Sequence, residues 1–136
     1  MDLDTLRTVM KKNALFQDLS PNDLEVLAAR AGERQFSPGE VIYHKGEVSA
    51  GKMALIVSGK VQVVAENGYV VRELGPGELI GEVGTVSREH KRTVTLGVVE
   101  PTQTIEWNID DVEGISPEFM KRLKDLAWKR LKYYSE

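Results

Sequence analysis

The chain has 136 residues, of which 41% are hydrophobic and 29% charged, a size and composition typical of one globular domain. It contains no cysteine, which excludes disulfides, thiolate metal sites and a cysteine nucleophile, and its net charge of −3 disfavours general binding to nucleic-acid phosphates. The first residues lack the apolar core of a signal peptide, and no run of about 18 apolar residues could span a membrane.

Residues 1–31 are predicted to form helices. Apolar residues recur at helical spacing in two segments and form a compact apolar group between them: Leu3, Leu6, Val9 and Met10; Leu15, Phe16 and Leu19; Leu24, Leu27, Ala28 and Ala31. Ser20 and Pro21 predict the start of the second helix, because serine caps a helix N-terminus and proline suits the first helical position.

From residue 32 onward, short β-rich runs alternate with glycine turns. The expected strands are 34–36, 41–44, 53–57, 61–64, 69–74, 93–99 and 103–109. Asn67–Gly68 between two apolar runs is a strong hairpin signal, and Ser58–Gly59 is interpreted as another turn. Many short strands joined by glycine turns predict a sandwich or jelly-roll barrel over residues 32–110.

The sequence Ser116–Pro117–Glu118 predicts the start of a last helix over residues 116–135. Its apolar stripe consists of Phe119, Met120, Leu123, Leu126, Ala127 and Leu131. The stripe does not keep a strict heptad, so a long coiled coil is not expected. Residues 116–136 carry six Lys and Arg against three Asp and Glu, which we interpret as a solvated polar face.

The stretch GELIGEVGTVSREHKRTVT, residues 77–95, has the features of an anion-binding loop. Glycine lets several backbone N–H groups approach one anion, and a short helical turn near Gly81 would add its N-terminal dipole. Arg92 could make a bidentate contact to a phosphate, and Glu82 could accept a hydrogen bond from a sugar 2′-OH. The spacing alone leaves open an ordinary glycine turn with solvated charges, and it does not match the Rossmann fingerprint.

Four segments in order resemble the cyclic nucleotide-binding domain family, which includes the catabolite activator protein, regulatory subunits of cyclic nucleotide-dependent kinases and cyclic nucleotide-gated channels. The segments are LFQDLS, FSPGEVIYHKGE, LIVSGKVQV and LGPGELIGE, followed by KRTVT. Two positions differ from the family pattern, since Lys91 stands where proline is usual and Val94 where a small residue is usual. The resemblance implies a mainly β fold with flanking helices, an antiparallel β-jelly-roll (double-stranded β-helix) with N-terminal helices and a C-terminal helix.

The resemblance also implies a ligand site in a phosphate-binding cassette at residues 75–95. Arg92 would pair with the cyclic phosphate, Glu82 would accept from the ribose 2′-OH, and Thr93 would complete the phosphate cradle. The implied ligand-binding residues are Gly81, Glu82, Val83, Gly84, Arg92 and Thr93. The threonine after the arginine favours cGMP slightly over cAMP. The last helix would cover the base, with Tyr133 and Tyr134 as candidates for the lid residue that stacks on it.

We therefore expect a single-domain, cytoplasmic sensor module for cAMP or cGMP that acts in trans on an unidentified regulatory protein. We expect no enzyme and no metal or further cofactor, because the chain shows no catalytic constellation and contains only two histidines, His44 and His90. No membrane contact and no DNA-binding domain in this chain are expected, and a homodimer through the last helix stays open. The alternative is a degenerate domain of the same fold that binds no nucleotide and serves protein–protein contact.

Overall fold

The structure, a computed structural model, describes residues 2–82 and 91–135, with the backbone alone for 131–135. The helices are α1 (Leu3–Lys11), α2 (Ala14–Gln17), α3 (Pro21–Arg30), α5 (Ile109–Ile115) and α6 (Pro117–Ser135). The strands are β1 (Gly32–Phe36), β2 (Val41–Tyr43), β3 (Lys52–Val64), β4 (Val70–Leu74), β5 (Leu79–Ile80) and β6 (Thr95–Asn108). Within the described residues, no helix is both long enough and apolar enough to cross a membrane.

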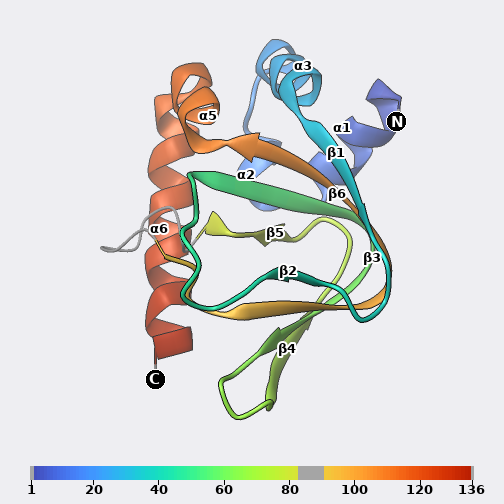
Figure 1. Ribbon diagram of the computed structural model, residues 1–136. Helices are drawn as coiled ribbons and strands as arrows, with labels where there is room; N and C mark the ends of the chain where they lie inside the picture. Colours follow the sequence, from blue (N-terminus) through green and yellow to red (C-terminus); the bar gives the residue numbers. More distant parts are fainter. Residues whose placement is uncertain (1, 83–90, 136) are drawn as a thin grey trace.

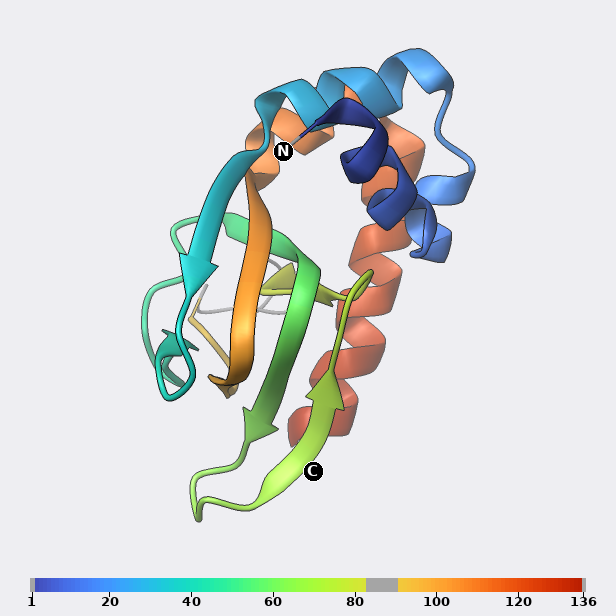
Figure 2. The same cartoon turned by 90° about the vertical axis from the view of Figure 1, so that its right-hand side faces the viewer.

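Within the part of the chain that the structure describes, six strands form one antiparallel sheet that bends into a roll, which confirms the jelly-roll prediction (Figure 1). The strand order is β1-β6-β3-β4, and the short strands β2 and β5 pair with β6 and β3. The helices α1, α3 and α5 lie at one end of the roll, and α6 runs along its side (Figure 2). This arrangement places the C-terminal helix next to β5.

Strand β3 separates two apolar cores because its side chains alternate between the faces of the sheet. Met53, Leu55 and Val57 face the core under the helices, whereas Ala54 and Ile56 face the core inside the roll. Burial on both faces explains why this strand reads as a continuous apolar run in the sequence.

The core under the helices is held by aromatic packing and one buried hydrogen bond. The Trp107 indole N–H donates to the carbonyl of Leu27 at 2.7 Å. The Phe16 ring lies 5.9 Å from the Trp107 ring and 5.0 Å from the Phe119 ring, between centroids. Phe16 is buried in α2, so the predicted apolar group around it contains a short helix of its own.

The structure corrects two of the predicted boundaries between strands. Ser58–Gly59 is not a turn but an irregularity within the single strand β3, where the register with β6 shifts. A Cβ atom on Gly59 would lie 2.3 Å from Thr102 Oγ1, so the close approach of β6 requires glycine there. The predicted strands 93–99 and 103–109 are likewise one strand, β6, which continues through Pro101.

A helix that the sequence pattern did not predict follows β6. Ile109 begins α5 and does not end a strand. The Asn108 side chain caps this helix by accepting from the N–H of Asp110 at 3.0 Å. By contrast, the hairpin predicted at Asn67–Gly68 is confirmed, because β3 and β4 pair on either side of it.

Candidate functional site

The roll contains a cavity of about 30 Å³ between its strands and α6. Its lining is apolar except for the side chains of Tyr43, Glu82, Arg92, Thr93 and Arg130. Four of the predicted site residues, Gly81, Glu82, Arg92 and Thr93, therefore line the same cavity. Val83 and Gly84, the other two, lie outside the described residues.

Arg92 is the main cation of the cavity, and it is 6% exposed. Its Nη1 donates to the carbonyl of Gly81 at 3.0 Å, and its Nη2 donates to the carbonyls of Ser49 and Lys52 at 3.1 and 3.0 Å. The guanidinium carbon lies 3.6 Å from the centre of the Tyr43 ring, which is cation–π geometry. Burial lowers the pKa of Arg92, but arginine titrates so far above neutrality that it remains charged.

Gly81 supplies the space that Arg92 occupies. Its φ of +86° is a left-handed conformation that favours glycine, and an added Cβ would lie 2.7 Å from Arg92 Nη1. The same Cβ would lie 3.1 Å from the carbonyl oxygen of Lys52. The glycine predicted for ligand approach thus has a role in seating the arginine.

A tight turn at residues 49–52, in which the Lys52 N–H donates to the Ser49 carbonyl at 3.2 Å, also presents that carbonyl to Arg92. Val48 forms a β-bridge with Lys91, and the Gly51 N–H donates to Ser49 Oγ at 3.3 Å. Ala50 in this turn has a φ of +54°, the left-handed region that an L residue with a Cβ adopts only at a cost. The segment before β3 therefore carries backbone strain next to the arginine.

The strain at Ala50 gives a stability prediction. We expect Ala50→Gly to raise the free energy of unfolding by up to about 1 kcal/mol, because relief of the left-handed strain exceeds the added entropy of the unfolded chain. Ala50→Val should lower it, because a β-branched residue fits this conformation worse. Urea denaturation of both variants measures the effect. A loss of stability in Ala50→Gly would contradict the assignment of strain.

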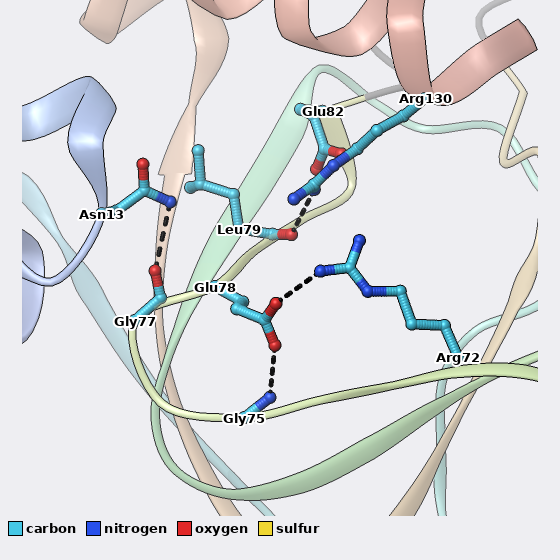
Figure 3. Close-up of polar contacts among 8 residues, drawn as sticks. All are labelled: Asn13, Arg72, Gly75, Gly77, Glu78, Leu79, Glu82 and Arg130. Carbon is cyan, nitrogen blue, oxygen red and sulfur yellow. Dashed lines mark hydrogen bonds and ion pairs between the residues drawn. The ribbon is translucent and has the colours of Figure 1, made fainter. Parts of the chain in front are cut away.

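Glu82 is the anion of the cavity and forms an ion pair with α6. Its side chain is almost fully buried, and its Oε1 accepts from Arg130 Nη1 at 2.6 Å (Figure 3). Arg130 Nη1 also donates to the carbonyl of Leu79 at 2.9 Å, and the Arg130 side chain is 15% exposed. Arg130 thus links the C-terminal helix to the cavity wall.

The sequence interpretation did not single out Arg130. It lies on the buried face of α6, seven residues after Leu123 and three after Ala127, both of which are fully buried. A charged residue at a stripe position is the signal that could have indicated it. Its partner could not be read from that spacing.

The turn before β5 is fixed on both of its sides (Figure 3). Glu78 accepts from the N–H of Gly75 at 2.6 Å and from Arg72 Nη2 at 2.8 Å. Asn13, between α1 and α2, donates from Nδ2 to the carbonyl of Gly77 at 3.1 Å. These contacts hold the strand that delivers Gly81 and Glu82 to the cavity.

The remaining residues predicted for the site differ in how much of them the structure describes. Thr93 and Val94 line the cavity and are half-buried, so Val94 stands at the wall where the family pattern has a smaller residue. Tyr133 and Tyr134 belong to α6, but their side chains lie outside the described residues. Among the residues that the structure describes, no group of three or more His, Asp or Glu is arranged to hold a metal ion.

Comparison with known proteins identifies relatives of this cavity-bearing roll. The family model of the cyclic nucleotide-binding domain matches residues 33–116, more than half of the chain. The chain is 36% identical over 92 residues to a cyclic nucleotide-gated cation channel protein of Drosophila melanogaster. That match covers 67% of this chain and 13% of the channel protein, so the chain spans a small part of this relative's length.

Solved structures of similar fold come from regulatory proteins. The structure of cAMP-bound PfPKA-R (141-441) matches with a TM-score of 0.82 at 14% identity, over 98% of this chain and 45% of that one. The regulatory subunit of a cAMP-independent protein kinase A from Trypanosoma cruzi, bound to guanosine, matches with a TM-score of 0.74 at 20% identity, over 83% of this chain and 40% of that one. At such identities the similarity concerns the fold.

Proposed function

The chain belongs to the cyclic nucleotide-binding domain family, and we propose that it binds a cyclic nucleoside monophosphate, cAMP or cGMP, in the cavity next to Arg92 and Glu82. The observation that carries the proposal is that a buried cation, Arg92, and a buried anion, Glu82, share this cavity. A cyclic phosphate offers a single negative charge to the arginine, and the ribose offers a hydroxyl to the carboxylate.

Nucleotide binding requires the cavity to widen. Its volume of about 30 Å³ holds a few water molecules at most, whereas pockets for small ligands enclose roughly 300 Å³ or more. The wall contributed by α6 through Arg130 is a separate element at the end of the chain, so we propose that this helix moves when the ligand enters. The helix then closes over the ligand, and the Glu82 carboxylate can accept from Arg130 and from the ribose together.

Movement of α6 makes a prediction for hydrogen exchange. We expect amide exchange to slow across residues 119–134 when cAMP or cGMP is added, because the ligand stabilises one packing of the helix through contacts that the other packing lacks. Exchange in α3, on the far side of the helical core, serves as the internal control. If α6 exchanges at the same rate with binding confirmed, the helix is scaffold only.

The proposed role is that of a sensor module that acts on a partner protein in trans, without catalysis of its own. Two alternatives compete with this proposal. The guanosine-bound relative favours a nucleoside ligand, but a nucleoside would leave the buried Arg92 without an anion. A domain that serves protein contact alone would retain the fold without any need for this pair of buried charges.

Native mass spectrometry of the purified chain tests the proposal. The protein is measured as purified and after incubation with cAMP, cGMP, 5′-AMP or guanosine. We expect a complex of one protein with one cyclic nucleotide. Binding of guanosine in preference to both cyclic nucleotides would replace the proposal with the nucleoside alternative, and binding of none would favour the protein-contact alternative.

A further inference from the structure

Tyr43 is a polar residue of the cavity that the sequence pattern did not indicate. It lies on β2, is 6% exposed, and packs in the core inside the roll. Its hydroxyl is buried and has no hydrogen-bond partner among the described residues. A buried hydroxyl without a partner costs stability, so its presence calls for an explanation.

The ring of Tyr43 already has a function, because the Arg92 guanidinium stacks on it at 3.6 Å. A phenylalanine would provide the same stacking surface without burying a hydroxyl. The extra oxygen therefore adds nothing to the stack or to the apolar core. Its value has to lie in a bond to something that enters the cavity.

The hydrogen bonds that Arg92 already makes indicate what the partner of the Tyr43 hydroxyl is. Three of its five N–H groups donate to the carbonyls of Gly81, Ser49 and Lys52. A phosphate held in this cavity has several acceptor oxygens but meets an arginine that is largely occupied by backbone. A second side-chain donor in the cavity would supply some of the hydrogen bonds to the phosphate oxygens that Arg92 cannot make.

We propose that the Tyr43 hydroxyl donates a hydrogen bond to an exocyclic oxygen of the ligand's phosphate, which makes Tyr43 a second anion-binding residue beside Arg92. This inference rests on the proposed function. Burial raises the pKa of Tyr43 to about 12, so the hydroxyl keeps its proton at neutral pH and can donate. The ring is fixed by the core around it, so little side-chain freedom is lost when the bond forms.

Tyr43→Phe is the test, because it keeps the ring under Arg92 and removes only the oxygen. We expect the dissociation constant for cAMP and cGMP to rise by about tenfold to a hundredfold, the usual effect of losing a hydrogen bond to a charged group. The melting temperature should stay the same or rise, because no protein partner is lost. Tyr69→Phe, at a residue that is 69% exposed, is the matched control and should change neither quantity.

Measuring both the dissociation constant and the melting temperature distinguishes a ligand contact from a structural role of Tyr43. If the hydroxyl served only the protein's own structure, Tyr43→Phe would lower the melting temperature and leave the affinity unchanged, and that result overturns the inference. Unchanged affinity for cyclic nucleotides in a folded Tyr43→Phe protein, with wild type binding, overturns it while leaving the proposed function intact. Absence of binding by the wild-type protein overturns both.

Discussion

Replacing Arg92 with alanine is expected to weaken the binding of cAMP or cGMP by roughly 30-fold to several thousand-fold. Backbone and helix-dipole contacts contribute about 0.3–1 kcal/mol each, which is too little to hold the anion tightly. Truncating one partner of a buried charge pair costs about 2–5 kcal/mol, and each 1.4 kcal/mol is about tenfold in affinity. Arg92→Lys should retain more affinity than Arg92→Ala but less than the wild type, since an ammonium cannot reproduce the planar donor set of the guanidinium.

The structure adds a second effect to this substitution. Arg92 satisfies three backbone carbonyls and stacks on Tyr43, so Arg92→Ala should also lower the free energy of unfolding. Affinity must therefore be measured on protein shown to be folded by its melting transition. Arg34→Ala is the control, because Arg34 stacks on Phe36 outside the cavity and is half exposed. A folded Arg92→Ala protein with wild-type affinity would contradict the role of Arg92.

Removing Glu82 should also weaken the binding of the ligand, and the size of this effect should depend on the sugar. We expect Glu82→Ala to weaken the binding of cAMP or cGMP by roughly tenfold to a hundredfold, because a hydrogen bond to a charged group contributes about 1.5–3 kcal/mol. For the 2′-deoxy analogues, Glu82→Ala should weaken binding much less. Calorimetry with both ligand types measures the difference, and an equal loss for the two would show that Glu82 does not contact the 2′-OH.

The ion pair of Glu82 with Arg130 makes a separate contribution to stability. Glu82→Ala removes the carboxylate from a largely buried Arg130 guanidinium, so the free energy of unfolding should fall by about 2–4 kcal/mol, below the 3–5 kcal/mol of a fully buried pair. In a double-mutant cycle with Arg130→Ala, the double variant should be less destabilised than the sum of the single variants. Additive effects would show that the pair contributes nothing.

The sequence indicated several residues that line the cavity but not their tertiary partners. Glu82, Arg92 and Thr93 could be assigned to one cavity because their spacing matches a family pattern. Arg130 lies 48 residues from Glu82, and the pair depends on how α6 packs along the roll. Tyr43 reaches the cavity from β2, whose pairing with β6 contains a register shift that no local pattern indicates.

The errors in the predicted secondary structure also arise where tertiary pairing overrides a local signal. The Ser58–Gly59 pair is compatible both with a turn and with a strand of irregular register. The long pairing of β3 with β6 determines that the strand continues through these residues. The missed helix α5 was predictable in part. Asn108 is a good cap and two aspartates follow in the first turn, but the alternation of Ile105, Trp107 and Ile109 favoured a longer strand.

Isothermal titration of the wild-type chain with cAMP and with cGMP tests whether the buried charges of this cavity hold a cyclic nucleotide. We predict saturable heat with a stoichiometry of about one ligand per chain for at least one of the two nucleotides, as expected for a single pocket in a small domain. The heat should be lost or sharply reduced in folded Arg92→Ala protein. No heat with either nucleotide at concentrations on the order of 1 mM, which corresponds to about −4.1 kcal/mol, would contradict the proposed binding.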